Sequence, residues 1–208
     1  MASPMPPPGA RLMLVFTLTP QLRPEMAAEA VRAGDVAAVV LRLPEGGAAA
    51  GLPLREVAEA IQRQDAAVLV EGSDGMATAA GLDGVHVSDP RNLAATVRSL
   101  KPQSIVGAGG IDTRHDAMEA GESGADYVFF GSLDPWDRAF PQVLDFVAWW
   151  AEVFEVPCVG LAASLDEAEE LARAGADFVV LAEALVADGG AAAVAAARAR
   201  LASVEAQP

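Results

Sequence analysis

Short apolar segments alternate with longer amphipathic segments along most of the chain. The short segments are continuous runs of Val, Leu, Ala and Phe, a pattern typical of strands covered on both faces in a parallel sheet. We predict eight such strands, at residues 12–17, 36–43, 66–70, 84–87, 104–107, 127–131, 158–161 and 178–181. The segments between them repeat apolar residues at helical spacing and predict helices at about 23–33, 54–64, 74–80, 92–100, 115–123, 141–154, 165–174 and 189–204. The alternation therefore predicts an α/β protein.

A Gly-x-Asp phrase recurs before every second predicted strand. It reads Gly-Leu-Asp from Gly81 and Gly-Ala-Asp from both Gly124 and Gly175, with a shortened Gly-Asp from Gly34. We expect each glycine to adopt the left-handed conformation that ends a helix before the turn into the next strand. Two strand–helix units separate each phrase from the next, so the chain is a fourfold repeat of such pairs. This repeat predicts a single-domain (β/α)8 barrel, or TIM barrel, over residues 11–208.

A doubly wound open sheet is the alternative fold, because it also alternates strands with helices. The predicted barrel is close to the smallest size at which that fold occurs. Residues 1–10 are rich in proline and contain no apolar signal-peptide core, so we expect a flexible tail there.

Composition and charge narrow the range of partners. The chain has 208 residues, of which 29 are acidic and 14 basic, and its formal net charge is −15. Nucleic acids and anionic membranes attract positive surfaces, so neither is an expected partner. No apolar stretch is long enough to span a bilayer. The lone Cys158 cannot form an internal disulfide, and we expect a buried thiol in a reducing, cytoplasmic compartment.

In barrels of this kind, chemistry is found where the carboxyl ends of the strands meet. The single lysine, Lys101, precedes a predicted strand and is expected at the opposite end, which argues against a Schiff-base aldolase. The candidate substrate-binding residues follow the predicted strands, and Asp89 is a candidate metal ligand. The substrate-binding candidates are Arg42, Glu71, His86, Gly109, Gly110, Ser132 and Glu183.

Several candidates also have a purely structural interpretation. The run 107–110 is either a phosphate-cradling loop or a tight turn. His86 either contacts a ligand or is a satisfied histidine at a strand end, and Asp89 either binds a metal or caps the next helix. Arg42 has the strongest functional claim, because it is a charge at the end of an apolar strand, yet it could instead pair with Glu71 on the adjacent strand.

Three phrases carry a family resemblance. They are Gly-Leu-Asp-Gly-Val-His-Val at 81–87, Gly-Ala-Asp-Tyr-Val-Phe-Phe-Gly at 124–131, and Val-Pro-Cys-Val at 156–159 followed by Gly-Ala-Asp at 175–177. With these phrases in this order, the chain resembles the thiamine phosphate synthase and TenI family of small (β/α)8 barrels. The resemblance implies a transferase of thiamine biosynthesis that joins hydroxymethylpyrimidine diphosphate to thiazole phosphate with Mg²⁺ and releases pyrophosphate. TenI-type relatives instead aromatise the thiazole with a histidine.

The chain departs from the family's pattern on the first strands. Of a Gln-x-Arg-x-Lys phrase it keeps only Arg42, and Glu71-Gly72 stands where an Asn-Asp pair is expected to bind diphosphate and metal. Asp89 is the nearest candidate for an acidic metal ligand. Gly109 replaces a serine, and Ile111 replaces the histidine of TenI-type relatives.

The later strands depart further. Ser132 and its neighbours have no counterpart of a Thr-x-Thr-Lys diphosphate clamp, and Ala162-Ala163-Ser164 replaces a Gly-Gly-Ile phosphate turn. Glu183 replaces the serine of an Ile-Ser phrase, which would place a carboxylate beside a phosphate. Like charges a few ångströms apart repel by roughly 1–4 kcal/mol. The departures predict a strongly altered active site.

Two hypotheses follow. In the first, the chain acts in thiamine biosynthesis as a divergent synthase, with Mg²⁺ as cofactor if transfer activity is retained. In the second, it is a non-catalytic or respecialised barrel that binds a phosphorylated or heterocyclic small molecule at its mouth. A homo-oligomer is also possible through Trp149 on the predicted helix 141–154, because the apolar stripe beside it, which includes Trp150, is expected to pack on the barrel.

Overall fold

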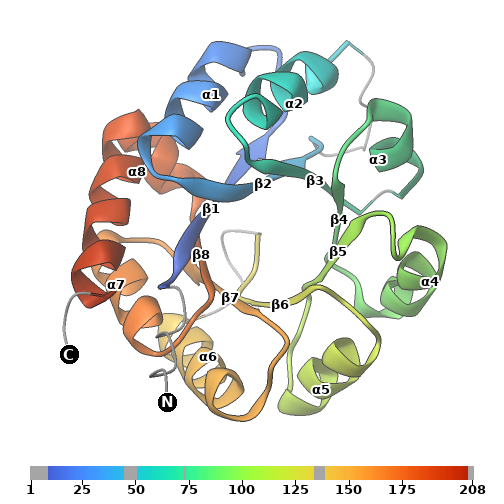
Figure 1. Ribbon diagram of the computed structural model, residues 1–208, viewed down its shortest axis with the longest axis vertical. Helices are drawn as coiled ribbons and strands as arrows, with labels where there is room; N and C mark the ends of the chain where they lie inside the picture. Colours follow the sequence, from blue (N-terminus) through green and yellow to red (C-terminus); the bar gives the residue numbers. More distant parts are fainter. Residues whose placement is uncertain (1–8, 45–50, 73, 134–138, 206–208) are drawn as a thin grey trace, which may run out of the picture.

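In the described part of the chain, eight parallel strands form a closed barrel that is ringed by eight helices (Figure 1). The computed structural model describes residues 9–44, 51–72, 74–133 and 139–205. The strands are β1 (Arg11–Thr17), β2 (Val36–Arg42), β3 (Ala67–Glu71), β4 (Gly84–Val87), β5 (Ile105–Ala108), β6 (Tyr127–Phe130), β7 (Cys158–Ala162) and β8 (Phe178–Leu181). The helices are α1 (Pro24–Ala33), α2 (Leu54–Gln62), α3 (Asp74–Ala80), α4 (Pro90–Leu100), α5 (Arg114–Glu122), α6 (Phe140–Val153), α7 (Leu165–Arg173) and α8 (Glu183–Glu205).

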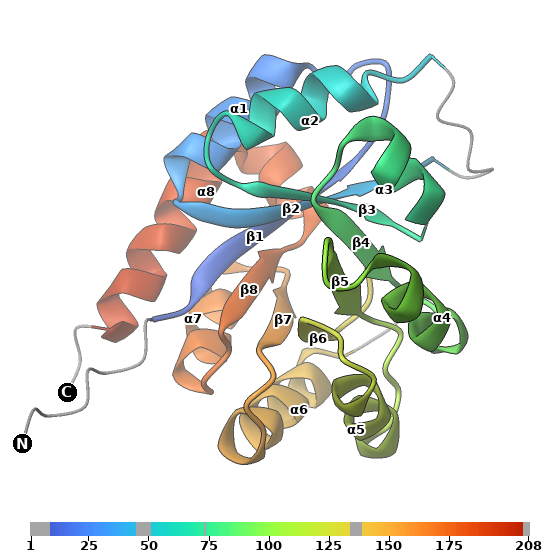
Figure 2. The same ribbon diagram turned by 45° about the vertical axis from the view of Figure 1, so that its right-hand side comes forward.

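The strand order follows the chain order, and the first strand pairs with the last. Leu14 of β1 lies opposite Leu181 of β8 in a parallel pair, which closes the ring. Closure confirms the predicted (β/α)8 barrel and excludes the open sheet. Of the expected tail, residues 1–8 lie outside the described residues. Figure 2 shows α1, α2 and α8 grouped along one side of the barrel.

The last helix differs most from the prediction. It was expected from residue 189, but α8 begins at Glu183, directly after β8, and contains non-helical backbone at Gly190 with φ 56° and ψ −149°. The apolar spacing detected from the sequence belongs only to the part after this glycine. The segment before it forms helix as well, so Glu183 is the first residue of a helix and not part of an extended turn.

The repeated Gly-x-Asp phrases build the amino-terminal end of the barrel. In three of them the glycine has positive φ, as predicted, and the aspartate accepts a backbone N–H near the start of the preceding strand. The acceptor and donor residues are Asp83 and Val68, Asp126 and Val106, and Asp177 and Cys158, with N–O distances of 2.7, 2.8 and 2.8 Å. Lys101 pairs with one of these aspartates, Asp126, at this same end, away from the mouth.

The shortened phrase before β2 corrects the prediction made for its glycine. Gly34 has φ −132°, and the left-handed residue is Asp35 with φ 51°. Glycine is still needed at position 34, because a Cβ there would lie 2.5 Å from Val194 of α8. The repeat therefore keeps its turn but moves the positive φ by one residue.

Apolar side chains fill both the barrel interior and the layer between strands and helices. The interior cluster consists of Met13, Val15, Ala38, Val40, Leu69, Tyr127, Phe129, Val159 and Val180. Cys158 belongs to the outer layer, and burial raises the pKa of its thiol to about 12, as suits a packing residue. Within the described ranges, no helix has the length and apolar character needed to cross a bilayer.

Helix α6 carries the aromatic stripe predicted to pack on the barrel. Trp150 is fully buried and stacks on Phe154 with ring centroids 4.0 Å apart, as expected. Trp149 was expected to project outward, but it is partly buried, with the Arg114 guanidinium 4.7 Å above its ring. The arginine covers part of the face that was expected to be free. A homo-oligomer through this helix stays a prediction.

Candidate functional site

A cavity of about 310 Å³ opens at the carboxyl ends of β3, β4, β5 and β6. Its lining combines carboxylates, hydroxyls, one imidazole and one aromatic ring, and it includes five of the predicted site residues. The lining residues are Glu71, His86, Ser88, Asp89, Pro90, Gly110, Asp112, Phe129, Gly131, Ser132 and Leu133. Among these described residues there is no lysine or arginine, so the charged groups of the lining are carboxylates.

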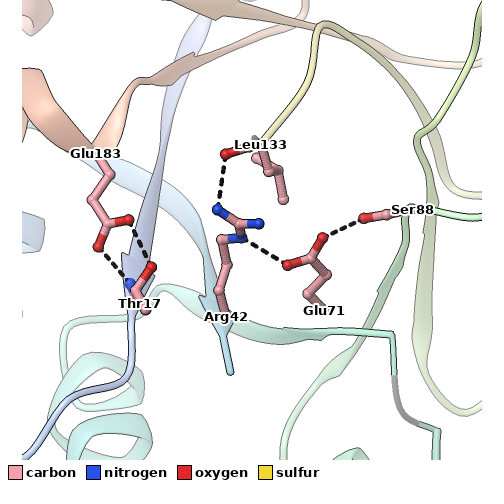
Figure 3. Close-up of polar contacts among 6 residues, drawn as sticks. All are labelled: Thr17, Arg42, Glu71, Ser88, Leu133 and Glu183. Atoms are coloured by element: carbon pink, nitrogen blue, oxygen red, sulfur yellow. Dashed lines mark hydrogen bonds and ion pairs between the residues drawn. The ribbon is translucent and has the colours of Figure 1, made fainter. Parts of the chain in front are cut away.

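Arg42 is not among the residues that line this cavity, but two of its hydrogen-bond partners are. Its Nε donates to Glu71 Oε2 at 2.7 Å, and its Nη1 donates to the Leu133 carbonyl at 2.8 Å (Figure 3). The other carboxylate oxygen, Glu71 Oε1, accepts from Ser88 Oγ at 2.6 Å. About a fifth of each side chain of the ion pair is exposed. The guanidinium is therefore neutralised within the site, which is the alternative that the sequence left open for Arg42.

Glu183 lies apart from this network, on the opposite side of the mouth (Figure 3). Its two carboxylate oxygens accept from the Thr17 backbone N–H at 2.6 Å and from Thr17 Oγ1 at 2.7 Å. This pair borders a second, more apolar cavity of about 400 Å³ between α1 and α8. Glu183 thus satisfies the end of β1, and it does not line the cavity beside Glu71.

His86 is the buried polar side chain at the floor of the first cavity. It is 2% exposed, its Nδ1 lies 2.8 Å from Tyr127 Oη, and its ring meets Phe129 edge-on with centroids 5.2 Å apart. Burial is the main cause that lowers the pKa of His86 to about 4, with Glu71 opposing the shift and Arg42 adding to it. The imidazole is therefore neutral near pH 7.

The glycines after β5 pack closely against neighbouring groups. Gly110 has φ 67°, and a Cβ there would collide with the Ser88 carbonyl, so the residue serves a tight turn. A Cβ on Gly109 would lie 2.6 Å from His86 Nε2. The phosphate-cradling role predicted for these two glycines stays a prediction, and close packing explains why both positions lack a side chain.

Asp89 caps α4. Its Oδ1 accepts from the Arg91 backbone N–H at 3.0 Å, and its carboxylate forms an ion pair with the Arg91 guanidinium at 2.8 Å. These bonds hold the pKa of Asp89 below its ordinary value. In the part of the chain that the structure describes, no group of three or more His, Cys, Asp or Glu could hold a metal ion. Mg²⁺ is usually held by only one or two carboxylates together with substrate phosphates, so the metal-ligand role of Asp89 and the Mg²⁺ cofactor stay predictions.

Five of the residues predicted from the sequence line one cavity in the structure. They are Glu71, His86, Asp89, Gly110 and Ser132. It missed Tyr127 and Phe129, because the continuous apolar run of β6 hides which of its residues face the barrel interior. The spacing of the two glycines in Gly107-x-Gly109 was an available signal, since alternate residues of a strand share a face.

Comparison with known proteins adds a consistent set of relatives. The family model described as thiamine monophosphate synthase matches residues 14–185. A thiamine-phosphate synthase of Rhodospirillum centenum is 38% identical over 168 residues, covering 78% of this chain and 81% of that protein. One of Hyphomonas neptunium is 34% identical over 192 residues, covering 85% and 86%. The solved thiamine phosphate pyrophosphorylase of Pyrococcus furiosus aligns with a TM-score of 0.74 at 21% identity, covering 93% and 96%, which shows a shared fold.

Proposed function

The chain belongs to the thiamine monophosphate synthase family, and from that premise we propose that it serves thiamine biosynthesis with a strongly altered barrel mouth. In this proposal the mouth binds a small heterocyclic ligand and does not hold a diphosphate. The cytoplasmic location expected from the sequence is part of the same proposal.

The observation that supports this most directly is the charge of the first cavity. Three carboxylates line it, those of Glu71, Asp89 and Asp112. Glu71 and Asp89 are paired with arginines that do not line the cavity, and no described lining residue is cationic. Arg42, the one cation retained from the family's first phrase, donates to Glu71 and to a carbonyl. A diphosphate at this position would meet carboxylates a few ångströms away, with repulsion of roughly 1–4 kcal/mol for each close pair.

The same lining suits an uncharged or weakly basic ring. Phe129 supplies an aromatic face, and Ser88 and Ser132 supply hydroxyl groups at the rim. Transfer with loss of pyrophosphate needs cationic groups where the negative charge develops. The described residues of the cavity do not supply them, and no group of three or more His, Cys, Asp or Glu lies among the described residues to gather a metal ion in their place. The residues of the mouth therefore favour binding of a ring over departure of a diphosphate.

A ligand panel tests the proposal. Melting temperature is measured with hydroxymethylpyrimidine, its diphosphate, thiazole phosphate and thiamine phosphate, each with and without Mg²⁺, and pyrophosphate release is assayed in parallel. We expect stabilisation by the unphosphorylated pyrimidine and no Mg²⁺-dependent gain from the diphosphate. In Glu71→Gln, which removes one negative charge from the cavity, the diphosphate should begin to stabilise the protein. Mg²⁺-dependent release of pyrophosphate by the unsubstituted protein would overturn the proposal.

Retained synthase activity is the second candidate. It is favoured by the 38% identity to the Rhodospirillum centenum synthase across most of both chains. Complementation of a thiamine auxotroph that lacks its own synthase tests it directly. Growth without added thiamine would establish this candidate, and loss of that growth in Arg42→Ala would link it to the mouth.

A further inference from the structure

Two in-register residues of β4 and β6 meet inside the barrel across a glycine. His86 is paired with Gly107 of β5, and Gly107 is paired with Tyr127 of β6. A Cβ on Gly107 would collide with the phenol ring of Tyr127. The missing side chain therefore lets Tyr127 extend across β5 until its hydroxyl contacts His86 Nδ1 at 2.8 Å.

The hydrogen-bonding capacity of Tyr127 decides which imidazole nitrogen carries the proton. The hydroxyl is buried, and among the described residues its partner is His86 Nδ1 alone. Burial raises the pKa of the phenol, so it keeps its proton and needs an acceptor. If Nδ1–H were the donor, the buried O–H would be left without an acceptor. The hydroxyl therefore donates to Nδ1, and the hydrogen of the neutral imidazole resides on Nε2.

Nε2 of His86 faces Gly109, the residue that follows β5. His86 lines the cavity and is 2% exposed, and its Nε2 has no hydrogen-bond partner within the described ranges. A Cβ at Gly109 would lie 2.6 Å from this atom. The serine expected there from the family resemblance would thus crowd Nε2, whereas glycine leaves its N–H open to a ligand.

We propose that Tyr127 holds His86 as a neutral Nε2–H donor aimed into the cavity, and that this donor selects ligands with an uncharged acceptor atom, a pyridine-type ring nitrogen or a carbonyl oxygen. The ligand class rests on the proposed function, in which the mouth binds a ring. Tyr127 is a positioning residue, because the histidine stands between it and the cavity. Gly109 determines whether a ligand can approach the Nε2–H of His86, because any side chain at position 109 would cover this donor.

The tautomer is tested without a ligand. Long-range ¹H–¹⁵N correlation spectra of the labelled protein report both histidines, and the exposed His115 serves as an internal reference. We expect His86 to show an unprotonated Nδ1 and a protonated Nε2 near pH 7. In Tyr127→Phe the two tautomers should mix, because the donor to Nδ1 is gone. A protonated Nδ1 in the unsubstituted protein, or an unchanged His86 signal in Tyr127→Phe, would overturn the assignment.

Ligand selection is tested with two probes that differ only in the ring acceptors. The probes are 4-amino-2-methylpyrimidine and its benzene analogue, 3-methylaniline. We expect the pyrimidine to bind at least tenfold more tightly, and this preference to fall severalfold in Tyr127→Phe. Gly109→Ala should lose the preference while keeping the tautomer, since it crowds Nε2 and leaves the Nδ1 bond intact. Ser123→Ala, which removes a hydroxyl at the end of α5, is the control and should change neither measurement.

The outcomes separate this inference from the proposed function. Equal affinity for the two probes, or no binding of either, would overturn the ligand class even with the expected tautomer. Mg²⁺-dependent pyrophosphate release would overturn the proposed function and would leave the tautomer and the probe preference standing.

Discussion

At the amino-terminal end of the barrel, Asp83, Asp126 and Asp177 each accept the N–H of a strand residue, whereas around the first cavity at the opposite end Arg42 and Glu71 bond to each other. The first arrangement repeats because each aspartate acts on backbone that every sequence supplies. The second does not repeat, because each side chain depends on the identity of its partner. One end of the barrel therefore supports the fold, and the other can change its chemistry with few substitutions.

The largest effect we predict comes from the cavity end, through His86. Its pKa is about 4 in the folded protein against an ordinary value of 6.5, so the unfolded chain binds the proton first as pH falls. The free energy of unfolding is therefore unaffected by His86 above pH 6.5. As pH falls toward 4, proton binding to His86 in the unfolded chain lowers it progressively, by up to about 3 kcal/mol. Urea unfolding between pH 7 and 4 should show this loss for the unsubstituted protein and not for His86→Gln.

The exposed histidine supplies the control for that experiment. His115 is about three-quarters exposed on α5, so His115→Gln should follow the pH profile of the unsubstituted protein. Parallel profiles for all three proteins would mean that the fold does not lower the pKa of His86, which contradicts burial as the cause of its neutrality.

The second effect belongs to the amino-terminal end. In Asp83→Ala, the N–H of the fully buried Val68 loses its acceptor, and we expect the free energy of unfolding to fall by about 2 kcal/mol. Asp83→Asn keeps a carbonyl oxygen and should lose less. Probe binding at the mouth should be unchanged in both. A ligand-binding defect in Asp83→Ala would show that the two ends are coupled, against the comparison drawn above.

The two ends of the barrel also differ in how much of their structure could be predicted from the sequence. The strands and the Gly-x-Asp turns were found because their signals are local: an apolar run, a glycine and an aspartate acting on nearby backbone. The shift of positive φ from Gly34 to Asp35 was not found. The close approach of Gly34 to Val194 was not found either, because it joins residues far apart in the chain.

At the mouth, residue types were predictable and partners were not. Arg42, Glu71 and His86 were identified as strand-end polar residues, and the pairing of the first two was foreseen as an alternative. Glu183 was predicted at a phosphate turn, and its hydrogen bonds to Thr17 of β1 could not be found from the sequence, because the two residues lie far apart in the chain. Tyr127 was missed because its role depends on the glycine between two strands, which only the register shows.

The third prediction concerns how much the ion pair between Arg42 and Glu71 contributes to the free energy of unfolding. Arg42→Met leaves the Glu71 carboxylate with Ser88 as its described partner, and we expect a loss of about 1–2 kcal/mol because the pair is largely buried. Adding Glu71→Gln removes the unpaired charge and should recover most of that loss. A double-mutant cycle from denaturant unfolding measures the coupling. Additive single effects would show that the two side chains do not support each other.

The smallest effect is expected at Asp89, where capping and metal binding make different predictions. Asp89→Ala removes the acceptor for the Arg91 N–H and should lower the melting temperature by about 2–4 °C. Asp89→Ser keeps a capping oxygen without the charge, so it should restore most of the loss if the residue acts as a cap. A metal ligand behaves differently, because serine would not replace a carboxylate on Mg²⁺. A Mg²⁺-dependent rise in melting temperature that disappears in Asp89→Ser would therefore assign this residue to metal binding, and with it give the cavity a cationic group that its described side chains do not provide.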